Sequence, residues 1–150
     1  EPPGDLHLGK LFADEVVCLV SREHPAVRRG WSLDDWLQAE HIAPTPTHPG
    51  ARGVIDAHLD GLGLSRNIVA RCAHFGQIPE MVASSLLVLT TGRQYCERFT
   101  ARLPLTILAP PLAFPPLGYY QLWHARTQHS AAAAWLRECV RKVADSLPKG

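Results

Sequence analysis

The sequence lacks the long apolar runs and the one-signed charge that mark several common classes of protein. No stretch approaches the roughly 20 apolar residues of a membrane-spanning helix, and no cationic start followed by an apolar core marks a signal peptide. Fifteen basic and 14 acidic residues give a net charge of +1, and the basic residues are scattered. We therefore expect no membrane span here and no basic stripe for nucleic acid, so any DNA-reading part should lie outside this chain.

Cysteine clusters are also missing. The four cysteines are far apart in the sequence and form no CxxC pair; they are Cys18, Cys72, Cys96 and Cys139. We expect small buried hydrophobic residues in a reducing cytosol, with two disulfides in a secreted protein as the alternative.

Catalytic and metal motifs are absent as well. The eight histidines show no HxH, HxxxH or HExxH spacing, so we expect no metal and no cofactor; a zinc site assembled from distant loops is the minor alternative. Ser84-Ser85 lacks the GxSxG elbow, and Cys96 lies on the apolar face of a predicted helix. The sequence therefore predicts a protein that is not an enzyme.

What the chain does have is an alternation of strand and helix patterns. Strands are predicted at 14–20, 41–44, 67–71, 86–89, 105–108 and 119–124, and helices at 33–39, 54–62, 93–101 and 131–147, with one more after His74-Phe75. Prolines stiffen the loop 44–50 and the connector 109–118. This order predicts an α/β fold with a mostly parallel sheet flanked by helices, in a chain of 150 residues that is long enough for one core.

The final helix has a strongly apolar face. Ser130 is its expected N-cap, and the face predicted to point inward comprises Trp135, Leu136, Cys139, Val140, Val143 and Leu147. On that reading, Trp135→Ala would cost roughly 3–5 kcal/mol as a core truncation.

The segment RCAHFGQIPEMVASSLLVLTTGR, residues 71–93, gathers polar groups at a strand end and a helix start. In open α/β sheets, small ligands bind at this edge. Because the segment holds no nucleophile–base pair, it indicates sensing of a small molecule rather than its conversion.

Five stretches together resemble one family: LFADEVVCLVSREHP, SLDDWLQAEHI, GVIDAHLDGLGL, AHFGQIPEMVASSLLVLTTGR and QLWHARTQHSAAAAWLREC. The chain resembles the second part of the effector-binding domain of LysR-type transcriptional regulators, most closely the branch that senses aromatic compounds and nodulation signals. The resemblance implies a fold like type II periplasmic binding proteins, with Rossmann-like lobes, a parallel-rich sheet flanked by helices, and an effector cleft between the lobes.

The resemblance also implies a domain layout and partners. Residues of about 22–117 would form the second lobe, and about 1–21 and 118–150 the crossing strands and part of the first lobe, with no DNA-binding domain present. A cytoplasmic homodimer or tetramer would bind a small aromatic or organic acid, and would reach DNA only through the missing N-terminal domain. The helix at 54–62 and the neighbouring sheet edge are the expected contact between copies.

Effector-binding residues follow from the same resemblance: His74, Phe75, Ile78, Arg52, Thr45, Thr47 and Leu122. Other roles stay open for some of them. His74 would cap the helix and Phe75 would belong to the core, while Arg52 and the threonines would lie in a solvated loop. Thr90 and Thr91 would either bind the ligand or cap the helix at Arg93.

Two rival functions share this fold. One is a periplasmic solute-binding lobe serving transport, and the other is an enzyme of the same architecture. The missing signal peptide and the scattered cysteines favour the regulator.

Overall fold

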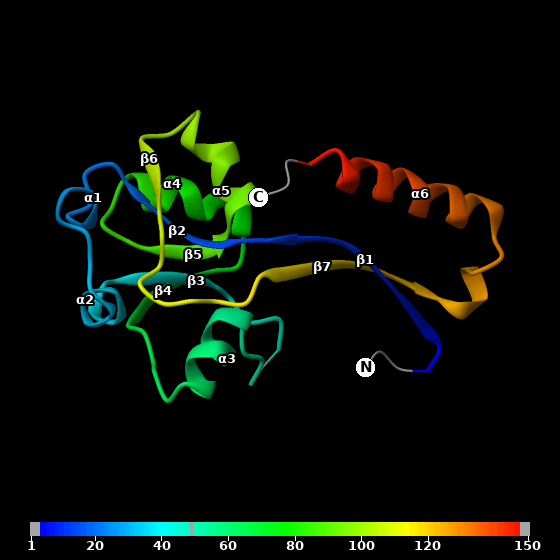
Figure 1. The fold of residues 1–150 in the computed structure, drawn as a ribbon, viewed down its shortest axis with the longest axis horizontal. Coiled ribbons are helices and arrows are strands. Elements are labelled where there is room, and N and C mark those ends of the chain that lie inside the picture. Colours follow the sequence, from blue (N-terminus) through cyan, green and yellow to red (C-terminus); the bar gives the residue numbers. More distant parts are fainter. Residues whose placement is uncertain (1–3, 49, 148–150) are drawn as a thin grey trace. The chain divides into compact units, whose positions relative to one another are not determined.

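The computed structural model describes residues 4–48 and 50–147. Pro49, in the loop predicted to be rigid, lies outside the described residues. In chain order, the elements are β1 (Leu6–Asp14), β2 (Val16–Ser21), α1 (Ala26–Arg29), α2 (Leu33–Gln38), β3 (His41–Pro44), α3 (Val54–Gly61), β4 (Ile68–Cys72), η1 (Phe75–Gln77), α4 (Ile78–Ala83), β5 (Leu89–Gly92), α5 (Arg93–Thr100), β6 (Leu105–Leu108), β7 (Leu117–His124), η2 (Ala125–Thr127) and α6 (Ala131–Asp145) (Figure 1).

The chain divides into two compact units. The larger unit is Val16–Pro115, and the smaller one combines the described residues up to Glu15 with those from Pro116 onward.

The larger unit is built on strands that run mostly in one direction. β3 pairs in parallel with β4, and a parallel bridge between His41 and Val88 connects β3 to the start of β5. β2 is the exception, because it pairs antiparallel with both β5 and β6. Several other elements lie between β2 and these two neighbours in the sequence. No strand–helix–strand crossover therefore joins β2 directly to β5 or β6, and β2 need not run parallel to them. The predicted α/β class is confirmed, with the parallel strands β3, β4, β5 and β6 surrounding one antiparallel strand.

The core lies on both faces of β2, whose six residues are all buried. On one face, Val17 and Leu19 join a cluster with Ile78 and Val82 of α4 and Cys96 of α5. On the other face, the Trp36 indole N–H of α2 donates to the Cys18 sulfur at 3.2 Å. Burial on both faces explains why β2 reads in the sequence as an unbroken apolar run.

The helix α2 begins as its sequence predicts. The Ser32 hydroxyl accepts a hydrogen bond from the Asp35 amide, and the Asp35 carboxylate accepts one from the Ser32 amide, which completes a capping box.

The four cysteines were predicted to be buried and not to form disulfides. Cys18 and Cys96 are buried, Cys72 and Cys139 are partly buried, and all four are free thiols.

Two elements were missed at the start of the chain. The predicted strand at 14–20 is the second of two strands, and β1 precedes it with a mixed polar pattern that includes His7, Gly9 and Lys10. The single turn α1 follows Pro25 where the sequence indicated only the end of a strand. Both are too short or too polar to give a clear periodic signal.

The strand predicted at 86–89 lies three residues later, as β5. The Ser85 hydroxyl donates to the Met81 carbonyl at 2.6 Å and accepts from the Leu87 amide at 3.2 Å, so residues after α4 stay in a turn. Thr90 and Thr91 are therefore inside the strand, and Gly92, without a side-chain hydrogen bond, occupies the N-cap of α5. The predicted threonine cap of this helix is wrong.

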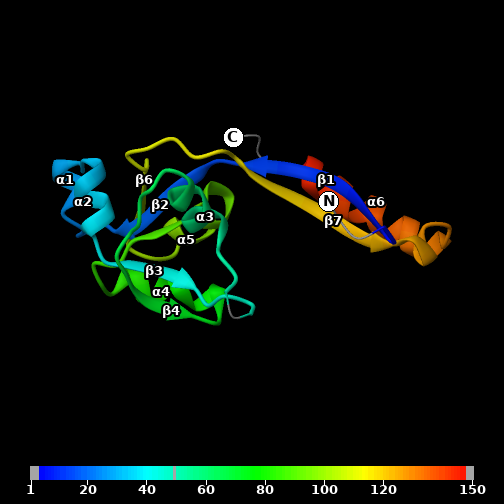
Figure 2. The same cartoon turned by 90° about the horizontal axis from the view of Figure 1, so that it is seen from below.

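The smaller unit is an antiparallel ribbon of β1 and β7, with α6 packed against β1 (Figure 2). The predicted inward face of α6 is a second correction, because Trp135 is 69% exposed and Val143 is 64% exposed. A two-stranded ribbon offers too little surface to cover the whole apolar stripe of a 15-residue helix.

Candidate ligand-binding site

The parallel strands β3 and β4 bring two loops of the larger unit to one edge. Pro44 at the end of β3 pairs with Cys72 at the end of β4, and the Thr45 amide donates to the Cys72 carbonyl at 3.0 Å. The loop carrying Thr45 and Thr47 and the turn carrying His74 therefore begin side by side, at the carboxyl ends of two parallel strands. This is the edge at which open α/β sheets bind ligands.

The turn at His74 is held by its backbone and leaves the ring exposed. The His74 carbonyl accepts hydrogen bonds from the Cys72 thiol at 3.3 Å and from the Gln77 amide at 2.9 Å. His74 occupies the N-cap of η1, but its side chain makes no capping hydrogen bond. Its imidazole has no partner among the residues that the structure describes, so the capping interpretation is wrong and the ring is available to a ligand.

Phe75 supports this turn from the core side. Its ring lies 4.4 Å from that of Tyr95, and the Tyr95 hydroxyl donates to the Phe75 carbonyl at 2.7 Å. Burial raises the pKa of Tyr95 to about 12, so its hydroxyl remains a donor at neutral pH. Phe75 is half-buried against the core cluster, so it offers a ligand only part of its ring.

Ile78 belongs to the core rather than to the surface of this edge. Its side chain is fully buried, between β2 and the other residues of the core cluster. The sequence placed it on the same helix as Phe75, but the first turn there is η1, and Ile78 points inward. Contact with an effector is therefore not expected of Ile78 in this structure.

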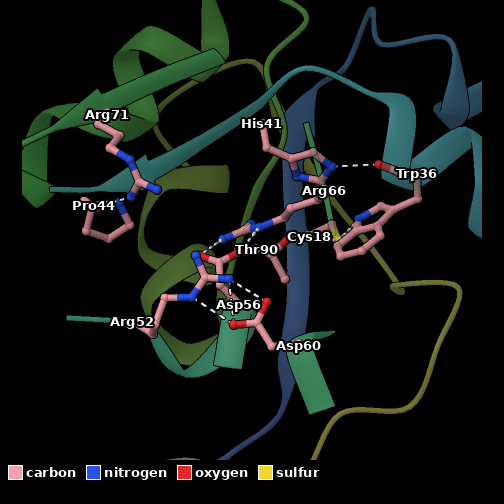
Figure 3. A network of polar contacts seen from close by, with 10 residues as sticks. All are labelled: Cys18, Trp36, His41, Pro44, Arg52, Asp56, Asp60, Arg66, Arg71 and Thr90. Carbon is pink, nitrogen blue, oxygen red and sulfur yellow. Dashed lines mark hydrogen bonds and ion pairs between the residues drawn. The ribbon is translucent and has the colours of Figure 1, made fainter. Parts of the chain in front are cut away.

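Arg71 is a cation that the sequence analysis did not select. It lies on β4 next to the exposed edge, and its guanidinium donates to the Pro44 carbonyl at 3.2 Å (Figure 3). One bond to a carbonyl leaves most of its donors and its full charge for an anion. The signal was present in the sequence, as a strand-end arginine three residues before His74.

Arg52 is already paired. Its guanidinium binds both carboxylate oxygens of Asp60 from the other end of α3, with Nε and Oδ2 2.8 Å apart (Figure 3). The hydrogen bonds and charge of Asp60 raise the pKa of Arg52. An effector carboxylate would have to displace Asp60, so Arg52 is a weaker candidate than Arg71.

The remaining predicted residues are placed as follows. Thr45 and Thr47 are exposed in the loop after β3. Leu122 lies on β7 in the smaller unit and is 56% exposed. Its predicted contact with an effector remains a prediction.

Beneath α3 lies a buried polar network that the sequence gave no sign of. Arg66 and Asp56 form an ion pair at 2.7 Å with side chains only 3% and 12% exposed. The His41 ring, fully buried, lies 2.6 Å from the Trp36 carbonyl, and the Cys18 sulfur lies 3.5 Å from the Thr90 hydroxyl (Figure 3). Burial raises the pKa of Cys18 to about 11, so this cysteine is a neutral thiol. The contacts of Trp36 hold α2 against β2 and β3, and the ion pair holds α3 to the connection that leads into β4.

A metal-binding cluster and a membrane-spanning helix are both absent from the described residues. No group of three or more His, Cys, Asp or Glu side chains among them is placed to hold a metal ion. None of the helices in residues 4–48 and 50–147 has the length and apolarity needed to cross a membrane.

Comparison with known proteins agrees with this architecture. The family model described as "LysR substrate binding domain" matches residues 1–145. The transcriptional regulator SyrM of Rhizobium etli is 32% identical over 143 residues, covering 93% of this chain and 40% of that protein.

Two solved structures have a similar fold. The probable transcriptional regulator PA0477 of Pseudomonas aeruginosa superposes with a TM-score of 0.82 at 25% identity, covering 93% of this chain and 46% of that one. The effector-binding domain of QuiR, solved in complex with shikimate, superposes with a TM-score of 0.76 at 16% identity, covering 97% of this chain and 68% of that one.

The chain thus spans less than half the length of SyrM and of PA0477. These relatives are transcriptional regulators, which confirms the prediction that the chain is not an enzyme and favours the regulator over the transport protein. The match over 145 of 150 residues shows that the chain belongs to the LysR substrate-binding domain family.

Proposed function

We propose that this chain is the effector-binding part of a LysR-type transcriptional regulator, which responds to a small molecule and passes that response to a DNA-binding domain outside this chain. The observation that carries the proposal is the family match over residues 1–145. Ligand binding would favour one arrangement of the regulator in proportion to the ligand's differential affinity for the alternatives. The regulator would act in the cytoplasm, where its DNA is.

The effector contacts the edge formed by β3 and β4. Arg71 supplies a positive charge, the exposed His74 ring supplies a hydrogen-bond donor, and the hydroxyls of Thr45 and Thr47 supply further polar contacts. Within the described residues no carboxylate makes an ion pair with Arg71, so the edge attracts an anion. The exposed part of Phe75 suits the flat face of a ring.

These groups favour an aromatic or other organic acid as the effector. The QuiR domain, similar in fold, was solved with shikimate, which is itself a carboxylate. The identity to SyrM of Rhizobium etli supports the narrower assignment to the aromatic and nodulation branch of the family.

The two units correspond to parts of two lobes in this proposal. The larger unit is the second lobe, while the ribbon β1–β7 with α6 belongs to the first lobe and its crossing strands. In the longer regulator, preceding residues cover the apolar face of α6, where Trp135, Leu136 and Val143 are exposed in this chain. Burial of that face would gain about 25 cal/mol for each Å² of apolar surface.

Two copies of the regulator associate through α3 and the adjoining strand β4. Val54 on α3, Leu62 at the C-cap of α3 and Val69 on β4 are each at least half exposed, and they form the apolar part of this surface. β4 pairs only with β3 among the described strands, so its outer edge is open to another strand or helix.

A thermal-shift screen tests the proposed function. The chain, and the same chain extended upstream, would be heated with benzoate, hydroxybenzoates and aliphatic acids in excess. A ligand that binds only the folded state raises stability by RT ln(1 + [L]/Kd). We expect selective stabilisation by aromatic acids, and its loss in His74→Ala but not in His129→Ala, an exposed histidine after η2. No stabilisation of either chain by any acid would contradict the proposal.

A further inference from the structure

A recess lies at the edge of the sheet opposite the β3–β4 edge, in the larger unit. It has a volume of about 630 Å³, within the range of roughly 300–1,000 Å³ that is usual for small-molecule sites. β2 runs against β3 and β4, so the segment after β2 lies at the edge away from His74 and Thr45. The recess is lined by residues of α1 and α2, of their connection and of the flanking positions, including His24, Arg29, Trp31, Asp35 and Ala39.

His24 and Trp31 form a fixed polar and aromatic wall. The His24 Nδ1 accepts from the Ala26 amide at 3.1 Å, so the ring proton is on Nε2. Burial lowers the pKa of His24, so the ring is neutral at pH 7 and Nε2–H is a donor. The Trp31 indole N–H donates to the Ala109 carbonyl at 3.1 Å, and its ring meets that of His24 edge-on at 5.8 Å. An indole held in this way gives a ligand a rigid apolar surface at little entropic cost.

The recess also carries two opposite charges that are not paired with each other. Arg29 makes no ion pair within the part of the chain that the structure describes. The Asp35 carboxylate accepts from the Ser32 amide and hydroxyl through Oδ2, which leaves Oδ1 without a protein donor among the described residues. A ligand with only a negative charge would be repelled by Asp35, and a ligand with only a positive charge would be repelled by Arg29. A ligand that carries both charges satisfies the two groups together.

We propose that this recess binds a small α-amino acid. The ligand carboxylate lies against Arg29 and the Nε2–H of His24, its ammonium group lies at Asp35, and its apolar side chain packs on Trp31. None of these residues belongs to the β3–β4 edge, so the proposal does not depend on the effector site proposed above. Trp31 is bonded to the segment leading toward β7, which gives an occupied recess a direct contact with that connector.

The test is an NMR titration of the 15N-labelled chain with L-phenylalanine, N-acetyl-L-phenylalanine and 2-phenylethylamine. With L-phenylalanine, we expect saturable shifts of the amides between residues 24 and 39. The two analogues, which each lack one charge, should bind at least about tenfold more weakly, equivalent to 1.4 kcal/mol.

Variants complete the test. Arg29→Gln should weaken L-phenylalanine binding about tenfold, while Arg28→Gln, a neighbouring arginine of α1 outside the recess, should leave the affinity unchanged. The proposal is overturned by the absence of saturable shifts up to about 10 mM, by equal affinity in Arg29→Gln, or by shifts confined to the amides of residues 71–75. The last result would assign the amino acid to the β3–β4 edge. If organic acids do not stabilise the protein in the thermal-shift screen but L-phenylalanine binds in the recess, only the proposed function is contradicted.

Discussion

The Tyr95 hydroxyl on α5 donates a hydrogen bond to the Phe75 carbonyl at 2.7 Å, and the two rings pack 4.4 Å apart. This contact fixes the backbone immediately after His74, so the core of the larger unit positions the exposed ring at the edge of the sheet. Tyr95→Phe keeps the ring packing and removes only the hydrogen bond. We expect a loss of about 1 kcal/mol in the free energy of unfolding, measured by urea denaturation. An unchanged midpoint would show that the bond does not hold the turn.

The buried and the exposed ion pair of α3 should differ strongly in their contribution to stability. Arg66→Ala leaves Asp56 buried without its partner, so we expect a loss of roughly 3–5 kcal/mol. Arg52→Ala breaks an exposed pair with Asp60 and should cost much less, because water screens the two charges. Chemical denaturation of the two variants checks this, and equal losses would contradict the burial of the Arg66–Asp56 pair.

His41 should make the chain less stable in mild acid. Burial lowers the pKa of His41 to about 4. The hydrogen bond with the Trp36 carbonyl opposes this, as the charge of Asp56 does to a smaller extent, while Arg66 and His24 lower the pKa further. The unfolded chain binds a proton near pH 6.5 whereas the folded chain resists it, so stability falls as the pH drops from 6.5 toward 4. The His41 contribution is at most roughly 3 kcal/mol.

The control for this pH dependence is His41→Gln, which keeps a donor but does not titrate. The free energy of unfolding would be measured for both proteins between pH 7 and pH 4. We expect the variant to lose less stability than the parent across this window, because carboxylates titrate equally in both. Parallel curves would rule out His41 as the titrating group.

Trp135→Ala should have a small effect in this chain. The side chain is 69% exposed, so we expect a change below about 1 kcal/mol rather than the larger loss predicted from the helical pattern. In the chain extended upstream, the same substitution should cost several-fold more, because the proposed first lobe covers α6. The melting temperatures of the parent and of Trp135→Ala would be measured in both chains. Equal small effects in both chains would contradict the proposed lobe assignment.

The sequence predicted elements best where local signals were complete. β3 and β6 were predicted with their observed bounds, and the capping box of α2 was recognised from Ser32 and Asp35. β5 was displaced because the apolar run 86–89 looked like a strand, while the Ser85 hydrogen bonds keep it in a turn. Such side-chain bonds to the backbone depend on geometry that periodicity does not contain.

The candidate site was predictable only in part. The family resemblance selected both Thr45 and His74 as effector-binding residues, and the structure places their backbones at one edge of the sheet. The pairing of Arg52 with Asp60 and the inward direction of Ile78 depend on tertiary contacts, and so does the exposure of α6. The hydrophobic pattern of α6 shows which face seeks burial, but it does not show whether this chain contains the partner surface.

The central claim is that the edge of β3 and β4 binds an organic acid through Arg71 and His74. Isothermal titration calorimetry of the chain with the acid selected by the thermal-shift screen tests it most directly. The parent would be compared with Arg71→Gln and with Arg98→Gln, an exposed arginine on α5. We expect Arg71→Gln to weaken binding about tenfold or more, because it loses a charge-assisted contact, and Arg98→Gln to bind like the parent. Equal affinities in all three proteins would contradict it.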